Sequence, residues 1–271
     1  MVCMVYFPYH TPYTTFLSMI VTLLGTGTSS GVPLIGCKCE VCRSLDYRDN
    51  RLRVSVYLKI DGKSFVIDTG PDFRQQMLRE SVGALDAVLL THQHKDHIAG
   101  LDDVRAYNFL QQRDMPIYAR AEVLQQLKTE FAYVFVEKRY PGIPRLQLHE
   151  IKNEPFEIAS ISFLPIDVMH HKMPVFGFRV RDFAYITDVN FIPDAEMAKL
   201  QNLEVLVLGA LQREPHLAHY NLEQALAVVE TLQPKRAYFT HISHRLGVHR
   251  AIDALLPPHV KLAYDGLRLV L

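Results

Sequence analysis

The chain has 271 residues, of which 49% are hydrophobic and 10% aromatic, and its 29 Lys and Arg balance its 29 Asp and Glu. This length suffices for one large buried core, and the balanced charge argues against bulk nucleic acid as a partner. No apolar run approaches the roughly 20 residues of a membrane helix. We therefore expect a globular protein without a membrane span, which attracts any anionic substrate through a local site.

Short apolar runs predict strands, and helical periodicity predicts the segments between them. The predicted strands, in chain order, are 20–24, 54–60, 64–67, 87–90, 117–118, 161–166, 177–180, 184–186, 205–208, 237–239 and 267–270. The predicted helices are 73–80, 101–112, 121–131, 194–199 and 222–232. Strands come in pairs early and alternate with helices late, which indicates two sheets face to face with helices outside. Periodicity alone also permits an open α/β sheet.

Residues 1–18 lack the basic start and the small-residue cleavage site of a signal peptide. They are interpreted either as a leader or peripheral segment, or as an upstream extension of a protein that naturally starts at Met19. No linker or internal repeat interrupts residues 19–271, which predicts a single domain. The cysteine cluster described below favours a reducing, cytoplasmic compartment. The oligomeric state stays open, a homodimer included.

Residues 91–97 read Thr-His-Gln-His-Lys-Asp-His and directly follow an apolar run. Imidazole nitrogens and carboxylate oxygens suit Zn²⁺, Mn²⁺ or Fe²⁺. The alternate spacing lets His92 and His94 face one ion while Asp96 and His97 face a neighbouring ion. Solvated loop residues are the alternative interpretation, but so many His and Asp at one strand end favour a metal site.

This segment resembles the His-x-His-x-Asp-His signature of the metallo-β-lactamase superfamily, whose fold is an αββα sandwich of two mixed sheets with helices outside. The resemblance implies that Asp68 orients a ligating imidazole, that Asp188 bridges two ions and that His241 is the last ligand. It also implies a His at a later strand end, where His170 and His171 both qualify and the following Val-Phe-Gly-Phe favours His170. The implied ligands of the catalytic centre are His92, His94, Asp96, His97, His170, Asp188 and His241.

Three of the four cysteines lie close together, at Cys37, Cys39 and Cys42. Thiolates at this spacing are typical of a closed zinc site, which needs a fourth ligand, whereas free buried or reactive thiols are the alternative. The superfamily branch that carries this cluster also carries His-Ile-Ser-His, so the resemblance assigns His244 as the fourth ligand. A structural zinc and the catalytic centre would then share the loop that holds His241.

The Cys cluster, the Gly-Thr-Gly-Thr-Ser-Ser-Gly turn, the His-Ile-Ser-His loop and Tyr264-Asp-Gly together resemble the PhnP-type phosphodiesterases, which open phosphoribosyl cyclic phosphates. The positive charge of two divalent ions exceeds the negative charge of the Asp96 and Asp188 carboxylates, so the centre suits an anionic ester. The resemblance implies that a hydroxide bridging two Zn or Mn ions hydrolyses a small cyclic phosphate or nucleotide-type phosphodiester. It assigns catalytic roles to Asp68, Asp96 and His219, with His219 at the phosphate or protonating the leaving oxygen, tasks that an ordinary imidazole can perform. A plain helix-start loop residue is the alternative for His219.

Three other functions are compatible with the same fold. A thioester or lactone hydrolase would use the same attack on a carbonyl carbon. A nuclease resembling the tRNA 3′-processing enzymes is disfavoured, because no long basic arm is inserted that could bind tRNA. A non-hydrolytic cofactor-biosynthesis protein resembling PqqB shares the Cys-rich loop, yet such proteins often lose ligands that this chain keeps.

Overall fold

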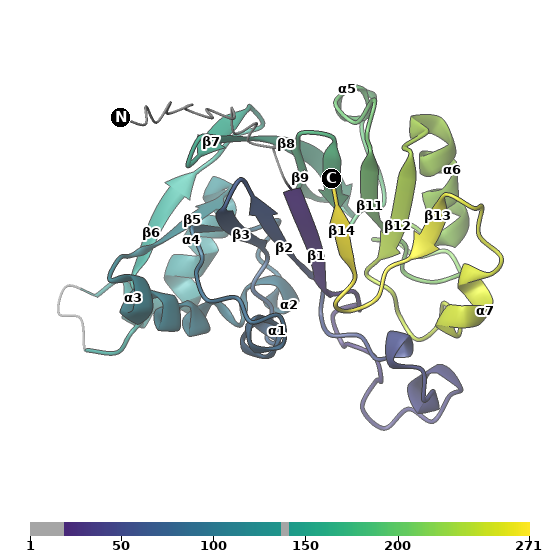
Figure 1. The fold of residues 1–271 in the computed structure, drawn as a ribbon, viewed down its shortest axis with the longest axis horizontal. Coiled ribbons are helices and arrows are strands. Elements are labelled where there is room, and N and C mark those ends of the chain that lie inside the picture. The colour runs from purple at the N-terminus through teal and green to yellow at the C-terminus, as the bar shows by residue number, and fades with distance from the viewer. Residues whose placement is uncertain (1–18, 137–140) are drawn as a thin grey trace, which may run out of the picture.

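The computed structural model describes residues 19–136 and 141–271, so the expectations for residues 1–18 lie outside the described residues. Within this range the strands form two seven-stranded sheets (Figure 1). The first contains, in spatial order, β14 (Arg268–Val270), β1 (Met19–Gly25), β2 (Ser55–Ile60), β3 (Lys63–Ile67), β4 (Ala87–Leu89), β5 (Met115–Ala119) and β6 (Leu146–Glu150). The second contains β13 (Val260–Leu262), β12 (Arg236–Thr240), β11 (Val205–Gly209), β10 (Phe183–Ile186), β9 (Met173–Val180), β8 (Ile161–His170) and β7 (Phe156–Ile158).

Both sheets are mixed in the same way. In the first, β14 to β3 pair antiparallel and β3 to β6 pair parallel. In the second, β7 to β10 pair antiparallel and β10 to β13 pair parallel. Because parallel strands end at the same sheet edge, loops from both sheets can meet at one end of the sandwich.

Alternating side chains explain why the two sheets face each other. In β3, Phe65 and Ile67 enter the core between the sheets, whereas Val66 enters the core under the helices of the first sheet. In β11, Val207 faces the central core and Leu208 faces the helices of the second sheet. Successive residues of a strand point to opposite faces, so continuously apolar strands need cover on both sides.

Helices supply that cover on the outer faces (Figure 1). Those on the first sheet are α1 (Phe73–Arg79), α2 (Lys95–Ile98), α3 (Arg105–Gln111) and α4 (Ala121–Glu130). Those on the second are α5 (Asp194–Ala198), α6 (Leu222–Leu232) and α7 (His249–Asp253). Short 3₁₀ turns occur at η1 (Val41–Arg43), η2 (Tyr47–Asp49), η3 (Leu101–Val104) and η4 (Ala132–Val134). The predicted αββα sandwich is confirmed.

Differences from the sequence-based prediction concern short elements. All predicted strands overlap observed ones, but the strands β6, β7 and β13 and the helices α2 and α7 were not predicted. These segments have five residues or fewer, too few for a clear period, and pairing with neighbours decides their conformation. The predicted helix 101–112 is divided into η3 and α3, because the chain changes from 3₁₀ to α-helical geometry at Arg105.

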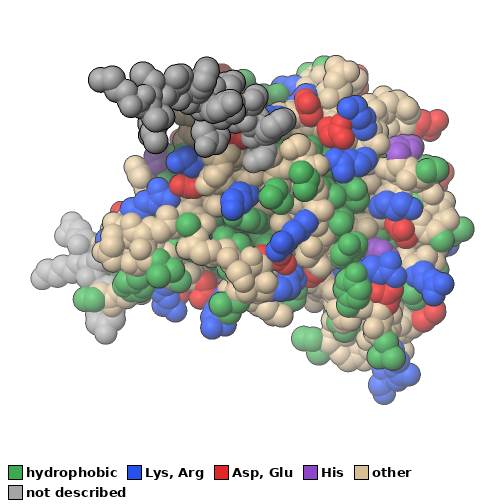
Figure 2. All heavy atoms as spheres, in the orientation of Figure 1, with side chains coloured by type: hydrophobic (Ala, Val, Ile, Leu, Met, Phe, Trp, Pro, Cys, Tyr) green, Lys and Arg blue, Asp and Glu red, His purple; other side chains and the backbone are tan. Residues whose placement is uncertain are grey.

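The surface is mixed in charge. On the face shown in Figure 2, basic and acidic side chains are interspersed, as the balanced composition predicts. Within the described residues, none of the helices is both long and apolar enough to span a membrane.

Candidate metal centre

The predicted ligands converge where strands of both sheets end. Asp68 directly follows β3, residues 92–97 follow β4, and His170 is the last residue of β8. On the second sheet, Asp188 lies just beyond β10 and His241 directly follows β12. The structure brings these segments together into overlapping groups whose ligand atoms lie within 4.8 Å of one another, and the groups contain His92, His94, Asp96, His97, His170, Asp188, His219 and His241.

Asp188 lies close to two groups of side chains. One contains His92, His94 and His170, and the other contains Asp96, His97 and His241. An Asp188 carboxylate oxygen lies 3.2 Å from His97 Nε2, and the other lies 3.2 Å from His241 Nε2 and 4.0 Å from His170 Nε2. One carboxylate therefore contacts imidazoles of both groups, the arrangement that lets an aspartate bridge two cations.

Hydrogen bonds fix which ring nitrogens face the centre. His97 Nδ1 donates to Asp68 Oδ2 at 2.7 Å, and His170 Nδ1 donates to the Ala218 carbonyl at 2.8 Å. Each ring thus directs the lone pair of Nε2 inward, as a metal-binding histidine requires. Asp68 takes the predicted orienting position and does not join the ligand groups.

Thr91 extends this support and was not predicted. Its hydroxyl donates to Asp68 Oδ2 at 2.8 Å and lies 2.9 Å from His92 Nδ1. The Thr91 side chain therefore links the His92 ring to the carboxylate that orients His97. Its place directly before His92 in the motif is the signal that could have identified it.

Several buried ring nitrogens at the centre have no hydrogen-bond partner. Among the described residues, these include Nε2 of His97 and both ring nitrogens of His241. Unpaired buried polar atoms are costly, and native structures rarely keep them without a reason. A divalent cation would satisfy these lone pairs, so the donor set fits the metals that the fold implies.

The structure separates the two neighbouring histidines at the end of β8. His170 is buried within the cluster. His171 lies in the short turn between β8 and β9, is exposed, and has a left-handed φ of 57°. Only His170 of this pair therefore faces the centre.

Three of the converging residues share an unusual backbone conformation. Asp68, Asp188 and His241 have φ values of 66°, 46° and 57°, in the left-handed region that side chains other than glycine rarely occupy. Each such residue costs on the order of 1–3 kcal/mol, and this kind of strain concentrates at functional sites. All three follow strands, so the turn redirects each side chain from its strand into the centre.

The charges of the centre are strongly coupled. Burial alone would raise the pKa of Asp188, but His241 and His97 outweigh burial and hold it well below its usual value. Burial alone would lower the pKa of His97, but Asp188, Asp68 and Asp96 together raise it well above its usual value.

His219 lies beside the cluster. Its Nδ1 is 3.9 Å from Asp188, and its ring centroid is 4.6 Å from those of His170 and His241. Burial and the neighbouring His241 lower its pKa to about 3. The pKa is this low because the ring is largely withdrawn from water. A neutral His219 remains able to donate or accept a hydrogen bond.

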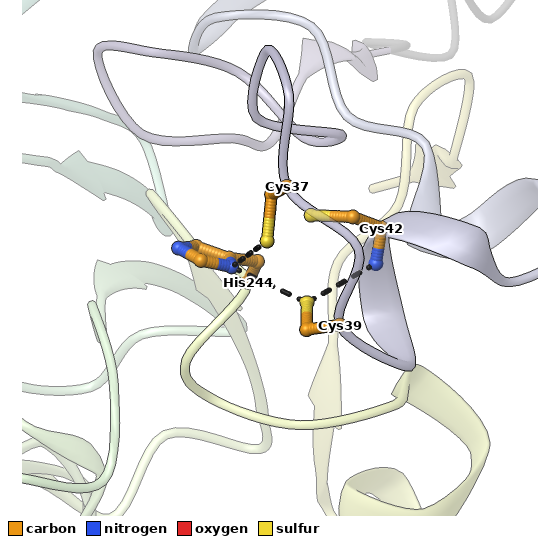
Figure 3. Close-up of side chains that lie close together, drawn as sticks. All are labelled: Cys37, Cys39, Cys42 and His244. Carbon is orange, nitrogen blue, oxygen red and sulfur yellow. Dashed lines mark hydrogen bonds between the residues drawn. The ribbon is translucent and has the colours of Figure 1, made fainter.

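The three cysteines and His244 form a second cluster (Figure 3). The sulfur atoms of Cys37 and Cys39 both lie 3.4 Å from His244 Nδ1. The backbone N–H of Cys42, assisted by His244, lowers the pKa of Cys39 to about 6, whereas burial raises the pKa of Cys42 to about 11. The cluster therefore offers a ready thiolate and a nitrogen ligand from a segment far away in the sequence.

A buried arginine supports the loops around this cluster. Arg51 donates to Thr26 Oγ1 at 2.8 Å and to the Ala263 carbonyl at 2.6 Å, and its guanidinium lies 3.0 Å from His249 Nδ1. Asp265, from the Tyr264-Asp-Gly segment, accepts hydrogen bonds from Thr26 Oγ1 and the Leu52 backbone. These contacts join the start of the cysteine loop to the C-terminal strand.

The αββα sandwich and the His and Asp cluster at its strand ends define a protein of the metallo-β-lactamase fold class. A family model described as "Beta-lactamase superfamily domain" matches residues 63–242. A solved structure described as a new diphosphatase from the PhnP family is 42% identical with a TM-score of 0.89, over 94% of this chain and 98% of that chain. The chain therefore belongs to the PhnP family of β-lactamase superfamily hydrolases.

Two curated relatives carry other names. An octanoyltransferase of Porphyromonas gingivalis is 39% identical over 92% of this chain, but the chain spans only 51% of that protein. The coenzyme PQQ synthesis protein B of Methylococcus capsulatus is 24% identical over 93% of this chain and 100% of its own length. The chain therefore spans about half the length of the first of these relatives.

Proposed function

We propose that this protein is a phosphodiesterase that holds two divalent ions, Zn²⁺ or Mn²⁺, and hydrolyses a small cyclic phosphate or nucleotide-type phosphodiester. The observation that carries the proposal is the position of Asp188 between two groups of imidazoles with inward lone pairs. Similarity to a protein described as a diphosphatase supports phosphorus as the reacting atom.

The residues divide between two ion sites. His92, His94 and His170 would hold one ion, Asp96, His97 and His241 the other, and Asp188 would contact both. When bound, two such ions lower the pKa of water and neutralise charge on phosphate oxygens. Two divalent ions exceed the charge of Asp96 and Asp188, so the centre attracts anions.

Residues around the ligands would control geometry and hydrogen bonding. Asp68 holds the His97 ring in the tautomer that keeps Nε2 free, and Thr91 holds both Asp68 and His92. His219, neutral and close to Asp188, would donate a hydrogen bond to a phosphate or leaving-group oxygen. Such a donor stabilises negative charge that develops during the reaction.

We also propose that Cys37, Cys39, Cys42 and His244 hold a structural Zn²⁺. Three sulfur atoms and one imidazole match the donor set of closed zinc sites. His244 follows His241 by three residues, so an ion here would restrain the loop that carries a ligand of the catalytic centre.

The matched pair His170→Ala and His171→Ala tests the function. Hydrolysis of bis-p-nitrophenyl phosphate by metal-loaded protein should fall by about 100-fold or more in His170→Ala, because loss of a ligand should exceed the 10- to 100-fold loss typical when a partner of a ligand is removed. It should remain near the wild-type rate in His171→Ala, because that side chain lies outside the centre. Equal rates in both variants would refute the assignment of the centre. A subsequent screen of cyclic phosphates identifies the preferred substrate.

A carbonyl substrate is the second candidate, favoured by the similarity to a protein named octanoyltransferase. That name covers a protein about twice as long as the matched segment, so its activity can reside in the other half. Metal-assisted attack at a carbonyl would use the same residues. Turnover of a thioester or nitrocefin without turnover of bis-p-nitrophenyl phosphate would favour this function over the phosphodiesterase.

A further inference from the structure

One of the two proposed ion sites draws its ligands from both sheets. His92 and His94 follow β4 of the first sheet, whereas His170 is the last residue of β8 in the second sheet. Their ligand atoms lie within 4.8 Å of one another, and we call these three side chains the first ion site. The shape of this site therefore depends on how the ends of the two sheets are spaced.

Arg120 joins the two sheets at this end of the sandwich. It directly follows β5, the parallel neighbour of β4, and its side chain reaches β8 and β9 of the second sheet. Arg120 Nη2 lies 2.8 Å from Asp167 Oδ1, and Arg120 Cζ lies 4.0 Å from the centroid of the Phe176 ring. Asp167 and Phe176 are opposite each other in the β8–β9 pair, so one guanidinium contacts both strands.

These contacts lead to a ligand on each sheet. The Phe176 backbone N–H donates to the Thr91 carbonyl at 3.1 Å, a hydrogen bond between the sheets, and that carbonyl belongs to the peptide group before His92. Asp167 lies on β8, three residues before His170. The guanidinium is therefore linked to one ligand on each sheet through short segments of backbone.

The chemistry of these contacts favours a guanidinium. A planar guanidinium can stack on an aromatic ring and pair with a carboxylate at the same time, whereas the ammonium of lysine is a compact point charge. Phe176 is 1% exposed, and the side chains of Arg120 and Asp167 are 21% and 30% exposed. Solvent therefore screens the ion pair only in part, and removal of the guanidinium would leave the Asp167 carboxylate without this partner.

We propose that Arg120 is a positioning residue for the ion at the first ion site. Through Asp167 and Phe176 it fixes the spacing between the sheets, and so the position of His170 relative to His92. The inference rests on the metal centre of the proposed function, but it depends neither on the identity of the substrate nor on turnover.

The effect should be confined to the first ion site. The second ion site contains Asp96, His97 and His241. His241 follows β12, which lies on the opposite side of β10 from β8 and β9, and Asp68 holds His97 through a separate hydrogen bond at 2.7 Å. General loosening of the fold would weaken the binding of both ions, whereas loss of the Arg120 contacts should weaken the binding of one.

The zinc affinities of Arg120→Met separate these two cases. Competition between zinc-loaded protein and a chelator measures the affinities without substrate. Arg120→Met should bind one catalytic ion about tenfold more weakly, at the lower end of the loss typical for groups that orient ligands, and should bind the other as wild type does.

Arg181→Met is the matched control. Arg181, in the turn between β9 and β10, forms an ion pair with Asp61, in the turn between β2 and β3. This pair also joins the two sheets, but at the end where β3 and β10 begin, opposite the metal centre. The Arg181 side chain is 32% exposed, close to the value for Arg120. Arg181→Met should therefore leave both affinities unchanged.

His170→Ala identifies which affinity belongs to the first ion site. The affinity that Arg120→Met lowers should be the one that His170→Ala removes, and adding Arg120→Met to His170→Ala should change the remaining affinities no further. Arg120→Lys keeps a positive charge opposite Asp167 but cannot stack as a planar group, so it should show a smaller loss at the same site. Thermal melting of each variant shows that it is folded at the temperature of the titration.

Unchanged zinc affinities in both Arg120→Met and Arg120→Lys overturn the positioning role. Equal losses at both ion sites, or a similar loss in Arg181→Met, also overturn it. If Arg120→Met shows the expected loss but wild-type protein does not hydrolyse bis-p-nitrophenyl phosphate, the positioning role stands and the proposed phosphodiesterase function fails. If wild-type protein has no zinc affinity that His170→Ala removes, both proposals fail.

Discussion

Replacing Asp68 by Asn should weaken metal binding through the tautomer of one histidine. The buried Asp68 carboxylate accepts hydrogen bonds from His97 Nδ1 at 2.7 Å, from the Thr91 hydroxyl at 2.8 Å and from the Thr91 backbone at 2.8 Å. An amide in the same position keeps one acceptor and presents an NH₂ group to the other two donors. His97 would then have to accept at Nδ1 and place its proton on Nε2, the atom that faces Asp188.

The expected effect is a loss of about 10- to 100-fold in affinity for one of two ions, as is typical when the partner of a ligating imidazole is removed. Competition with a chelator on stepwise metal-loaded protein measures both affinities. Asp72→Asn is the matched control, because Asp72 accepts from the Arg53 backbone at 2.8 Å and contacts no imidazole of the centre. Wild-type affinity for both ions in Asp68→Asn would refute the argument from the tautomer.

Two further predictions concern stability. Cys39→Ala should reduce bound zinc by one ion per chain and lower the melting temperature, because a structural zinc contributes folding free energy. Unchanged zinc content in Cys39→Ala would contradict the site. Burial raises the pKa of Asp265 to about 6 against an ordinary 3.8, so the folded state binds a proton more tightly than the unfolded state. The resulting penalty, on the order of 3 kcal/mol, is absent below pH 3.8, grows as pH rises and is complete above pH 6. Unfolding of Asp265→Asn from pH 4 to 7 should therefore show the variant gaining stability relative to wild type as pH rises, and parallel curves would contradict the raised pKa.

Features that depend on neighbouring residues were predictable from the sequence. The segment 91–97 carries its own spacing, so its side chains had to leave one strand end together. The same holds for α6, where Leu222 to Leu232 repeat the helical period and the Asn221 side chain caps the first turn. Continuously apolar strands such as β11 likewise predicted a sheet that is buried on both faces.

Features that depend on distant contacts required the tertiary structure. His170 and His171 are chemically alike, and only the Ala218 carbonyl and the turn between β8 and β9 separate their roles. The low pKa of His219 arises from burial among rings on other strands, which no local pattern encodes. β7 and β13 are strands because longer neighbours pair with them.

The sequence by itself thus predicted a candidate metal site and the layered architecture, because a contiguous motif and an alternating strand depend only on local backbone geometry. The tertiary structure decided which histidine faces the centre and which ring nitrogen is free. Those properties depend on hydrogen bonds, burial and charge between residues that are far apart in the sequence. Cys37 and His244, for example, are 207 positions apart and meet only once the sheets have packed.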